Sequence, residues 1–285
     1  MSLRLEMLQV SRLAPRLLGE SADRVRGFVE GRLTKDGGFA GRDGHADLYY
    51  TVFGLDCLEA LRAEIPRARV AAYLRGFGDG DGLDLVHLAC LARSWAAVGS
   101  ELDDELRAAL RVRLAGLAGG ARRVTDRFLA VGACQDLGED SPAAGELESF
   151  LSAQTTEDGG WANEPPAASG STPATAAAVT LLASLGRDVP AGAGPWLEAR
   201  HTVHGGFTAA PGVPMPDLLS TAVVLHALAA LERPLARFVE PCLDFVDTLW
   251  TNAGAFHGHW ADDEVDCEYT YYGLLALGHL SLWTE

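Results

Sequence analysis

The stretch FLSAQTTEDGGW, residues 150–161, decides the fold, because the chain contains several related copies of it. The other clear copies are FVEGRLTKDGGF (28–39), WLEARHTVHGGF (196–207) and FVDTLWTNAGAF (245–256). In each copy an aromatic residue stands eleven positions before a second aromatic that follows Gly-Gly or Gly-Ala. Two weaker copies, around 76–77 and 119–120, bring the count to six. Such a period predicts one supersecondary unit used repeatedly.

A strongly apolar segment follows each of these turns. The segments are DLYYTVFGLDCLEAL from 47, DLVHLACLARS from 84, DRFLAVGACQDL from 126, STPATAAAVTLLASL from 171, DLLSTAVVLHALAAL from 217 and DCEYTYYGLLALGHL from 266. Segments that are apolar nearly all round predict helices buried on both sides, whereas charged-and-apolar stretches such as ELDDELRAALRVRLAGL (101–117) predict outer helices that face water. The Asp or Ser that opens each inner segment is a natural N-cap. Each unit is therefore predicted to be a hairpin of an outer and an inner helix.

The predicted organisation is a single all-helical domain over residues 1–285. After an N-terminal helical extension, 1–19, we place the repeats near 20–63, 64–99, 100–138, 139–186, 187–232 and 233–285. Stacked helix hairpins bury a continuous core only against their neighbours. Six such units are able to close into a ring.

The composition excludes several functions. A formal net charge of −16 would repel a nucleic-acid backbone, so no nucleic-acid partner is expected. Charged residues interrupt the apolar ones near the N-terminus and no later stretch is long enough for a membrane span. The five cysteines are scattered and odd in number, which favours buried thiols in a reducing compartment. We therefore predict a cytoplasmic protein.

The DGGF and DGGW turns, GGFAGRDGHADLYYT (37–51) and FLSAQTTEDGGW resemble the repeats of protein prenyltransferase β-subunits and squalene-hopene-type cyclases. The likeness covers the chain from about residue 20, and Gln154 with Trp161 resembles the Q-W motif of the cyclases. It implies an α/α toroid with a central, aromatic-lined cavity that takes an isoprenoid. It also implies catalytic groups at the amino ends of inner helices.

The zinc site of protein prenyltransferases is only partly matched. Asp266 resembles their zinc-binding Asp, but Glu268 stands where the thiolate is expected and Cys267 is displaced by one position. Tyr50 takes the place of their His ligand. Because zinc requires thiolate and imidazole ligands in defined number, a catalytic zinc is not expected.

The cyclases resemble the same segment through DxDD followed by Thr, in which the middle Asp protonates an alkene. Here Asp266, Glu268 and Tyr269 precede Thr270, so the middle carboxyl is kept as Glu268. A carboxyl in the wall of an apolar cavity has a raised pKa, and a second carboxylate raises it further. We predict Glu268 as the catalytic acid, supported by Asp266 and Tyr269.

Residues that could contact the substrate surround this segment. Asp262, Asp263 and Asp266 have the DDxxD spacing by which isoprenyl-diphosphate enzymes hold Mg²⁺, a cation that prefers carboxylate and phosphate oxygens. Arg42 and His259 match the position of a cationic diphosphate contact in the prenyltransferases. The remaining candidate contacts are Asp47, Tyr50, Trp161 and Asp217. Simple alternatives exist: the Asp residues are N-caps, and the turn aromatics belong to the core.

The leading prediction is an isoprenoid-processing enzyme that acts on a small prenyl (diphosphate) substrate without a zinc-thiolate site. A second interpretation is a non-catalytic ring that binds a lipid, a peptide or a protein. A third is a β-like subunit that works with a helical partner, and a homo-oligomer is also open.

Overall fold

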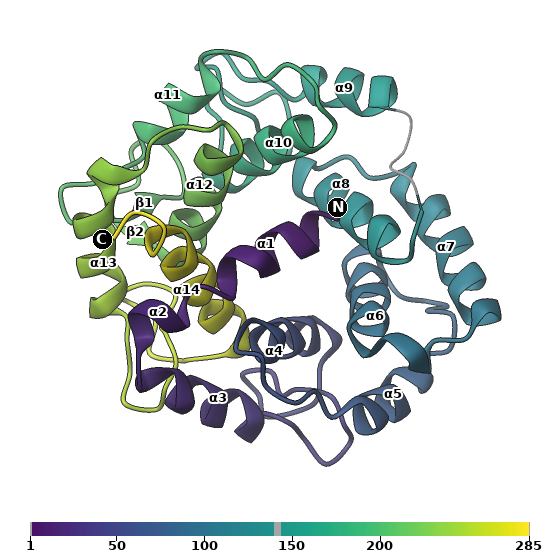
Figure 1. Ribbon diagram of the computed structural model, residues 1–285. Coiled ribbons are helices and arrows are strands. Elements are labelled where there is room, and N and C mark those ends of the chain that lie inside the picture. The colour runs from purple at the N-terminus through teal and green to yellow at the C-terminus, as the bar shows by residue number, and fades with distance from the viewer. Residues whose placement is uncertain (1, 140–143, 285) are drawn as a thin grey trace.

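Six helix hairpins form a ring in the computed structural model, which describes residues 2–139 and 144–284. The outer and inner helices pair as α3 (Ser21–Gly31) with α4 (Leu48–Ala60), α5 (Arg67–Arg75) with α6 (Leu85–Val98), α7 (Asp104–Ala118) with α8 (Val124–Asp136), α9 (Ala144–Ala153) with α10 (Thr172–Ser184), α11 (Ala193–Glu198) with α12 (Leu218–Ala230), and α13 (Val239–Thr248) with α14 (Cys267–Leu280). Figure 1 shows the inner helices arranged inside the outer ones. The predicted α/α toroid is confirmed.

Few other elements occur in the described residues. Two short 3₁₀ helices, η1 (Gly99–Glu101) and η2 (Ala236–Phe238), precede outer helices α7 and α13. Strands β1 (Phe207–Thr208) and β2 (Pro216–Asp217) form a small antiparallel pair in the connection between α11 and α12. Within the ranges described, no helix combines the length and the apolarity needed to cross a bilayer.

A threonine at the fourth position of the inner helix ties the turn to that helix in three of the four clear copies. The Phe39 amide donates to Thr51 Oγ1 at 2.9 Å, and the Trp161 amide donates to Thr175 Oγ1 at 2.9 Å. The Phe207 amide makes the equivalent bond to Thr221 Oγ1 at 3.0 Å. These bonds satisfy the buried amide of each turn aromatic, which otherwise would cost free energy. The repeat is thus a hydrogen-bonding unit as well as a pattern of aromatics.

The ring closes through the same contact that joins neighbouring repeats. A Cβ at Gly37 would overlap with the Arg69 carbonyl oxygen in α5, the outer helix of the next repeat. A Cβ at Gly254, in the turn of the last repeat, would overlap with the Arg24 carbonyl oxygen in α3, the outer helix of the first. The last turn therefore packs on the first repeat as an ordinary neighbour.

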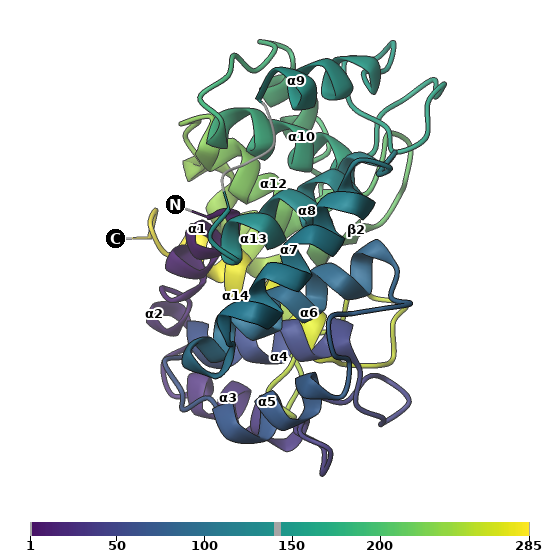
Figure 2. The same cartoon turned by 90° about the vertical axis from the view of Figure 1, so that its right-hand side faces the viewer.

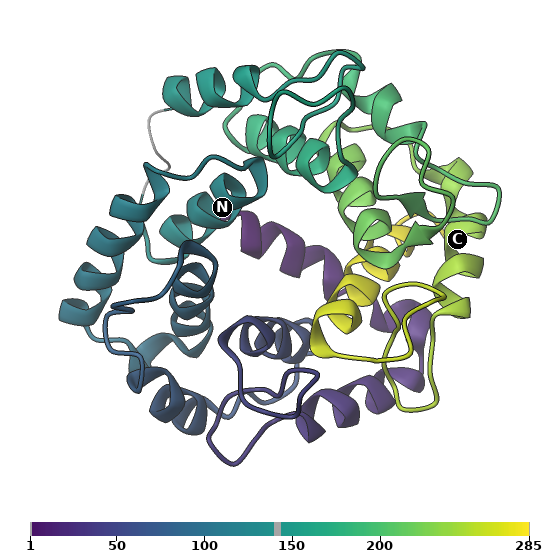
Figure 3. The same ribbon diagram turned by 180° about the vertical axis from the view of Figure 1, so that it is seen from behind.

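The N-terminal helices α1 (Leu3–Ser11) and α2 (Pro15–Leu18) lie outside the hairpin pattern. Helix α1 crosses the middle of the ring and packs against α4, α8 and α14 (Figures 1 and 3). The Arg4 guanidinium lies 2.8 Å from Asp56 Oδ1, and Ser2 Oγ donates to Asp136 Oδ1 at 2.8 Å. Both acceptors lie toward the carboxyl ends of their inner helices. Helix α1 therefore covers the mouth at which inner helices end, on the side that carries both termini in Figure 2.

The predicted N-caps are largely present. Asp47, Asp84, Asp217 and Asp266 each accept a hydrogen bond from a backbone amide in the first turn of their inner helix. The prediction for Asp126 is wrong: α8 begins at Val124 with Arg123 as N-cap, so Asp126 lies within the first turn. An acidic residue there still faces the positive end of the helix dipole.

Candidate active site

A central cavity of about 220 Å³ lies inside the ring of inner helices. Its wall is largely aromatic and aliphatic, and Met7 of α1 contributes to the lining. The aromatic side chains are Tyr49, Phe53, Phe128, Tyr271 and Tyr272. An apolar cavity lined by aromatic rings suits a hydrocarbon ligand, and the ring faces attract a positive charge.

Glu268 lies one hydrogen bond from this cavity. It is the second residue of α14, and its Oε1 accepts a hydrogen bond of 2.6 Å from the hydroxyl of Tyr49, which lines the cavity. Burial raises the pKa of Glu268 from 4.5 to about 7; Asp266 raises it further, while the Tyr49 hydrogen bond and Arg42 lower it. The carboxyl can therefore hold a proton near neutral pH and release it to a neighbouring acceptor.

Arg42 joins the first repeat to the last beside Glu268. Its Nε lies 2.7 Å from Asp266 Oδ2, and its terminal nitrogens lie 2.8 Å and 3.1 Å from the two carboxylate oxygens of Asp262. The same guanidinium lies 5.6 Å from the centre of the Tyr269 ring. Four of the residues predicted from sequence thus form one cluster: Arg42, Asp262, Asp266 and Tyr269. Because Arg42 remains partly exposed, an anionic ligand could reach it from solvent.

The carboxylates of this cluster face the guanidinium. Among the described residues, no group of three or more His, Cys, Asp or Glu side chains is arranged to hold a metal ion. Asp263 is exposed and stands apart from the Arg42 contacts. Binding of Mg²⁺ at Asp262, Asp263 and Asp266 stays a prediction, and it would require these carboxylates to turn from Arg42 toward the ion.

The residues that stand at the prenyltransferase zinc positions make other contacts in this structure. The Cys267 thiol is fully buried, and burial raises its pKa to about 12 when no metal ion is bound. The absence of a catalytic zinc stays a prediction from the residue types, because a bound zinc ion would itself lower the pKa of a thiol ligand. Glu268 is held by Tyr49.

The remaining candidates divide into two groups. Tyr50 packs edge-on against Tyr49, with ring centres 5.6 Å apart. Burial raises the pKa of Asp217, and the nearby His259 lowers the Asp217 pKa by a smaller amount. These residues surround the amino ends of inner helices, with Asp47 as the N-cap of α4. Trp161 is only 2% exposed, donates its indole N–H to the Leu151 carbonyl at 2.9 Å and does not line the cavity.

Sequence reasoning missed the polar cavity residues Arg93, Thr125, Thr180 and His226. A signal for Arg93 exists, since it is the single Arg, Lys, Asp or Glu residue in the apolar helix α6. His226 similarly interrupts the apolar helix α12. An isolated charge or imidazole in an otherwise apolar inner helix can mark a cavity-facing position.

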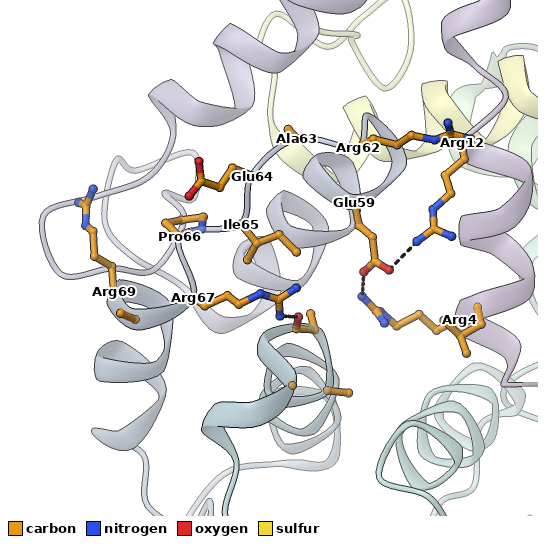
Figure 4. A pocket seen from close by; sticks show the side chains of 15 residues that line it. Arg4, Arg12, Glu59, Arg62, Ala63, Glu64, Ile65, Pro66, Arg67 and Arg69 are labelled. Carbon is orange, nitrogen blue, oxygen red and sulfur yellow. Dashed lines mark hydrogen bonds and ion pairs between the residues drawn. The ribbon is translucent and has the colours of Figure 1, made fainter.

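A larger hollow, of about 1230 Å³, lies where α1 meets the loop between α4 and α5 (Figure 4). Several of its polar groups are already engaged: Arg4 and Arg12 share Glu59, at 2.7 Å and 2.8 Å, and Arg67 donates to the Ala97 carbonyl at 2.7 Å. It lies at the end covered by α1, away from Glu268. The central cavity is therefore the stronger candidate for chemistry.

The sequence matches the model of the prenyltransferase alpha-alpha toroid domain over residues 6–92 and 191–285. The chain belongs to this family. The matched parts contain Arg42, Glu268 and the contacts between the first and last repeats. No curated protein shows significant similarity to the sequence.

Proposed function

We propose that this protein is an isoprenoid-processing enzyme whose acid is Glu268. The observation that carries the proposal is the partly buried Glu268 carboxyl, with a pKa of about 7, hydrogen-bonded to a tyrosine in the wall of an aromatic cavity. Membership of the family supports an isoprenoid ligand. A reducing, cytoplasmic location fits the five buried, free cysteines.

The chemistry follows from the charged groups at the open end of the ring, where the inner helices begin. The ligand extends past Tyr49 to the amino end of α14, where Glu268 donates its proton to an alkene carbon, so that a C–H bond forms and the adjacent carbon becomes a cation. The ring faces of Tyr49, Phe53 and Tyr272 stabilise that cation, which ends by losing a proton to a base. Asp266 and Tyr269 hold Arg42 beside the acid, and Arg42 together with His259 binds a diphosphate where the substrate carries one.

The cavity favours a short substrate. An apolar cavity of about 150 Å³ holds the six carbons of a benzene ring, so by simple scaling one of about 220 Å³ takes about nine carbons, close to the ten of two isoprene units. Longer prenyl chains would have to displace the wall or α1.

The test is incubation of the purified protein with prenyl diphosphates of increasing length, with and without Mg²⁺, with products identified by mass spectrometry. We expect turnover with short chains in the wild type and its loss in Glu268→Gln. Glu264→Gln is the control, because Glu264 is an exposed carboxylate in the neighbouring loop. Turnover that survives in Glu268→Gln would remove the proposed mechanism.

A second candidate is a non-catalytic ring that binds a lipid, a peptide or a protein partner. The observation in its favour is that Arg42 is already paired with two carboxylates. In that case the same assay yields no product from any chain length, while a ligand or partner still binds.

A further inference from the structure

The residues that line the cavity follow the turns of the inner helices. Because an α-helix has about 3.6 residues per turn, positions two, five or six, and nine of an inner helix lie on one face. Helix α10 presents Pro173, Ala176, Ala177 and Thr180 in this register. Helix α12 presents Leu219, Val223 and His226 in the same register. The lining is thus built in layers from the open mouth to the end covered by α1.

The deepest layer is polar. The ninth residue of the inner helix lines the cavity in α6, α10 and α12, and these residues are Arg93, Thr180 and His226. They lie about 10 Å along the helices from the mouth layer. The layers above them are mainly aromatic or aliphatic. We call Arg93, Thr180 and His226 the polar floor.

Buried polar atoms at this end of the cavity lack partners within the described residues. His226 is 8% exposed; its Nδ1 lies 3.1 Å from His279 Nε2, while its other ring nitrogen, Nε2, has no hydrogen-bond partner. The hydroxyl of Tyr271, which is 1% exposed, also has none.

Arg93 is held loosely. Its terminal nitrogen is 3.4 Å from Asp56 Oδ2, and its Nε is 3.7 Å from Asp136 Oδ2, beyond hydrogen-bond distance. The Nε atom is buried and has no hydrogen-bond partner. Leaving a buried donor unsatisfied typically costs about 1–3 kcal/mol. These atoms have almost no surface open to the cavity, so a ligand oxygen would reach them only after a small rotation of the Arg93 or His226 side chain, and it would then remove part of that cost.

We propose that the polar floor is a binding subsite for an oxygen-bearing group, a hydroxyl or carbonyl, at the inner end of the ligand. The ligand is then an oxygenated short isoprenoid rather than a plain hydrocarbon chain. Identification of the carbon skeleton rests on the proposed function, whereas the subsite rests on the cavity itself. The wall binds the hydrocarbon part, and the floor selects ligands that bring an oxygen to Arg93 and His226.

The experiment compares geraniol with the hydrocarbon that lacks its hydroxyl group. Geraniol has no diphosphate to hold it at Arg42, so its hydroxyl is free to enter first and reach the polar floor. Both displace an apolar fluorescent probe from the purified full-length protein, and each affinity is corrected for partition between water and octanol. We expect geraniol to bind about tenfold more tightly, because one to two satisfied hydrogen bonds contribute about that much.

Two sets of variants assign the preference to the floor. Thr180→Val removes a hydroxyl at nearly constant volume. His226→Leu with His279→Leu removes the imidazole pair together, so that neither ring is left buried alone. In both, the preference for geraniol falls by about threefold or more. Ala177→Val, in the apolar wall, weakens both ligands to the same extent.

Equal corrected affinities in the wild type, failure of both ligands to bind, or an unchanged preference in the floor variants would each overturn the subsite. The outcome is separable from the proposed chemistry. Glu268→Gln leaves the preference for geraniol intact even where turnover is lost. If turnover depends on Glu268 but the preference is absent, this inference alone fails.

Discussion

Glu268 is the residue on which the chemistry depends, and its burial has a consequence for stability. The folded protein binds the Glu268 proton up to a pKa of about 7, whereas the unfolded chain releases it near 4.5. Between these values the folded state holds a proton that the unfolded state does not, so stability falls as pH rises through this window. Above pH 7 the cost reaches about 3 kcal/mol.

We therefore expect Glu268→Gln to stabilise the fold at about pH 8 by up to ~3 kcal/mol, and to change little below pH 4.5. The amide keeps the shape and an acceptor for Tyr49 but carries no charge. Urea unfolding at several pH values measures the difference. An equal effect at all pH values would contradict the assigned burial of the carboxylate.

Tyr49 tunes that carboxyl through its hydroxyl. The hydrogen bond from Tyr49 to Glu268 favours the ionised form and lowers the pKa against the effect of burial. Tyr49→Phe should therefore move the Glu268 pKa above 7, and any activity limb that follows Glu268 ionisation should move to higher pH. Infrared titration of the carboxyl, with Glu268→Gln as the blank, reads this shift without turnover. A lower pKa in Tyr49→Phe would mean that the hydroxyl does not stabilise the carboxylate.

At the scale of elements, the inner helices and a helical N-terminal extension could be predicted, but the position of α1 across the ring could not. Inner helices such as α10 and α12 are apolar on nearly every side, and the Asp and Ser caps before them define where they begin. Helix α1 carries Arg4, Glu6 and several apolar residues, a pattern that is equally typical of a surface helix. Its place across the ring depends on ion pairs with residues more than fifty positions away, and no local pattern encodes those.

The ion pair that fixes α1 gives a prediction for that element. Arg4 and Asp56 are 5% and 1% exposed, so removal of one partner leaves a buried charge. Arg4→Met should destabilise the fold by about 3 kcal/mol or more, while the double variant Arg4→Met with Asp56→Leu should recover part of the loss. Hydrogen exchange of α1 amides together with urea unfolding measures both effects. A neutral Arg4→Met would show that packing on α4 and α14, without the ion pair, holds the helix.

For the whole molecule, the repeat in the sequence predicted the ring. It does not specify which residues come together at the seam, the junction where the last repeat contacts the first. The sequence identified Arg42, Asp262, Asp266 and Glu268 separately, because each follows a recurrent turn or opens an inner helix. That Arg42 of the first repeat pairs with Asp262 and Asp266 of the last follows from closure, which brings the ends of the chain together. The polar floor was missed for a related reason: its members come from three inner helices and share only their ninth position.

Closure itself can be tested at Gly254. This residue has φ of +86°, and a Cβ there would overlap with the Arg24 backbone of the first outer helix. Gly159 occupies the same place in the fourth repeat with φ of +87°, but a Cβ there meets nothing within 4 Å. Alanine at either position carries the same strain of about 1–2 kcal/mol from the left-handed conformation.

The difference between the two variants therefore isolates the seam. We expect Gly254→Ala to destabilise the fold by at least about 2 kcal/mol more than Gly159→Ala, since the overlapping atom is backbone and cannot turn away as a side chain would. Hydrogen exchange should rise in α3 and α13, which flank the seam, and the Arg42 contacts across it should loosen. If both variants lose the same stability, the contact between the last turn and the first outer helix does not hold the ring closed. The seam is then held by the packing of α4 on α14 and by the Arg42 ion pairs.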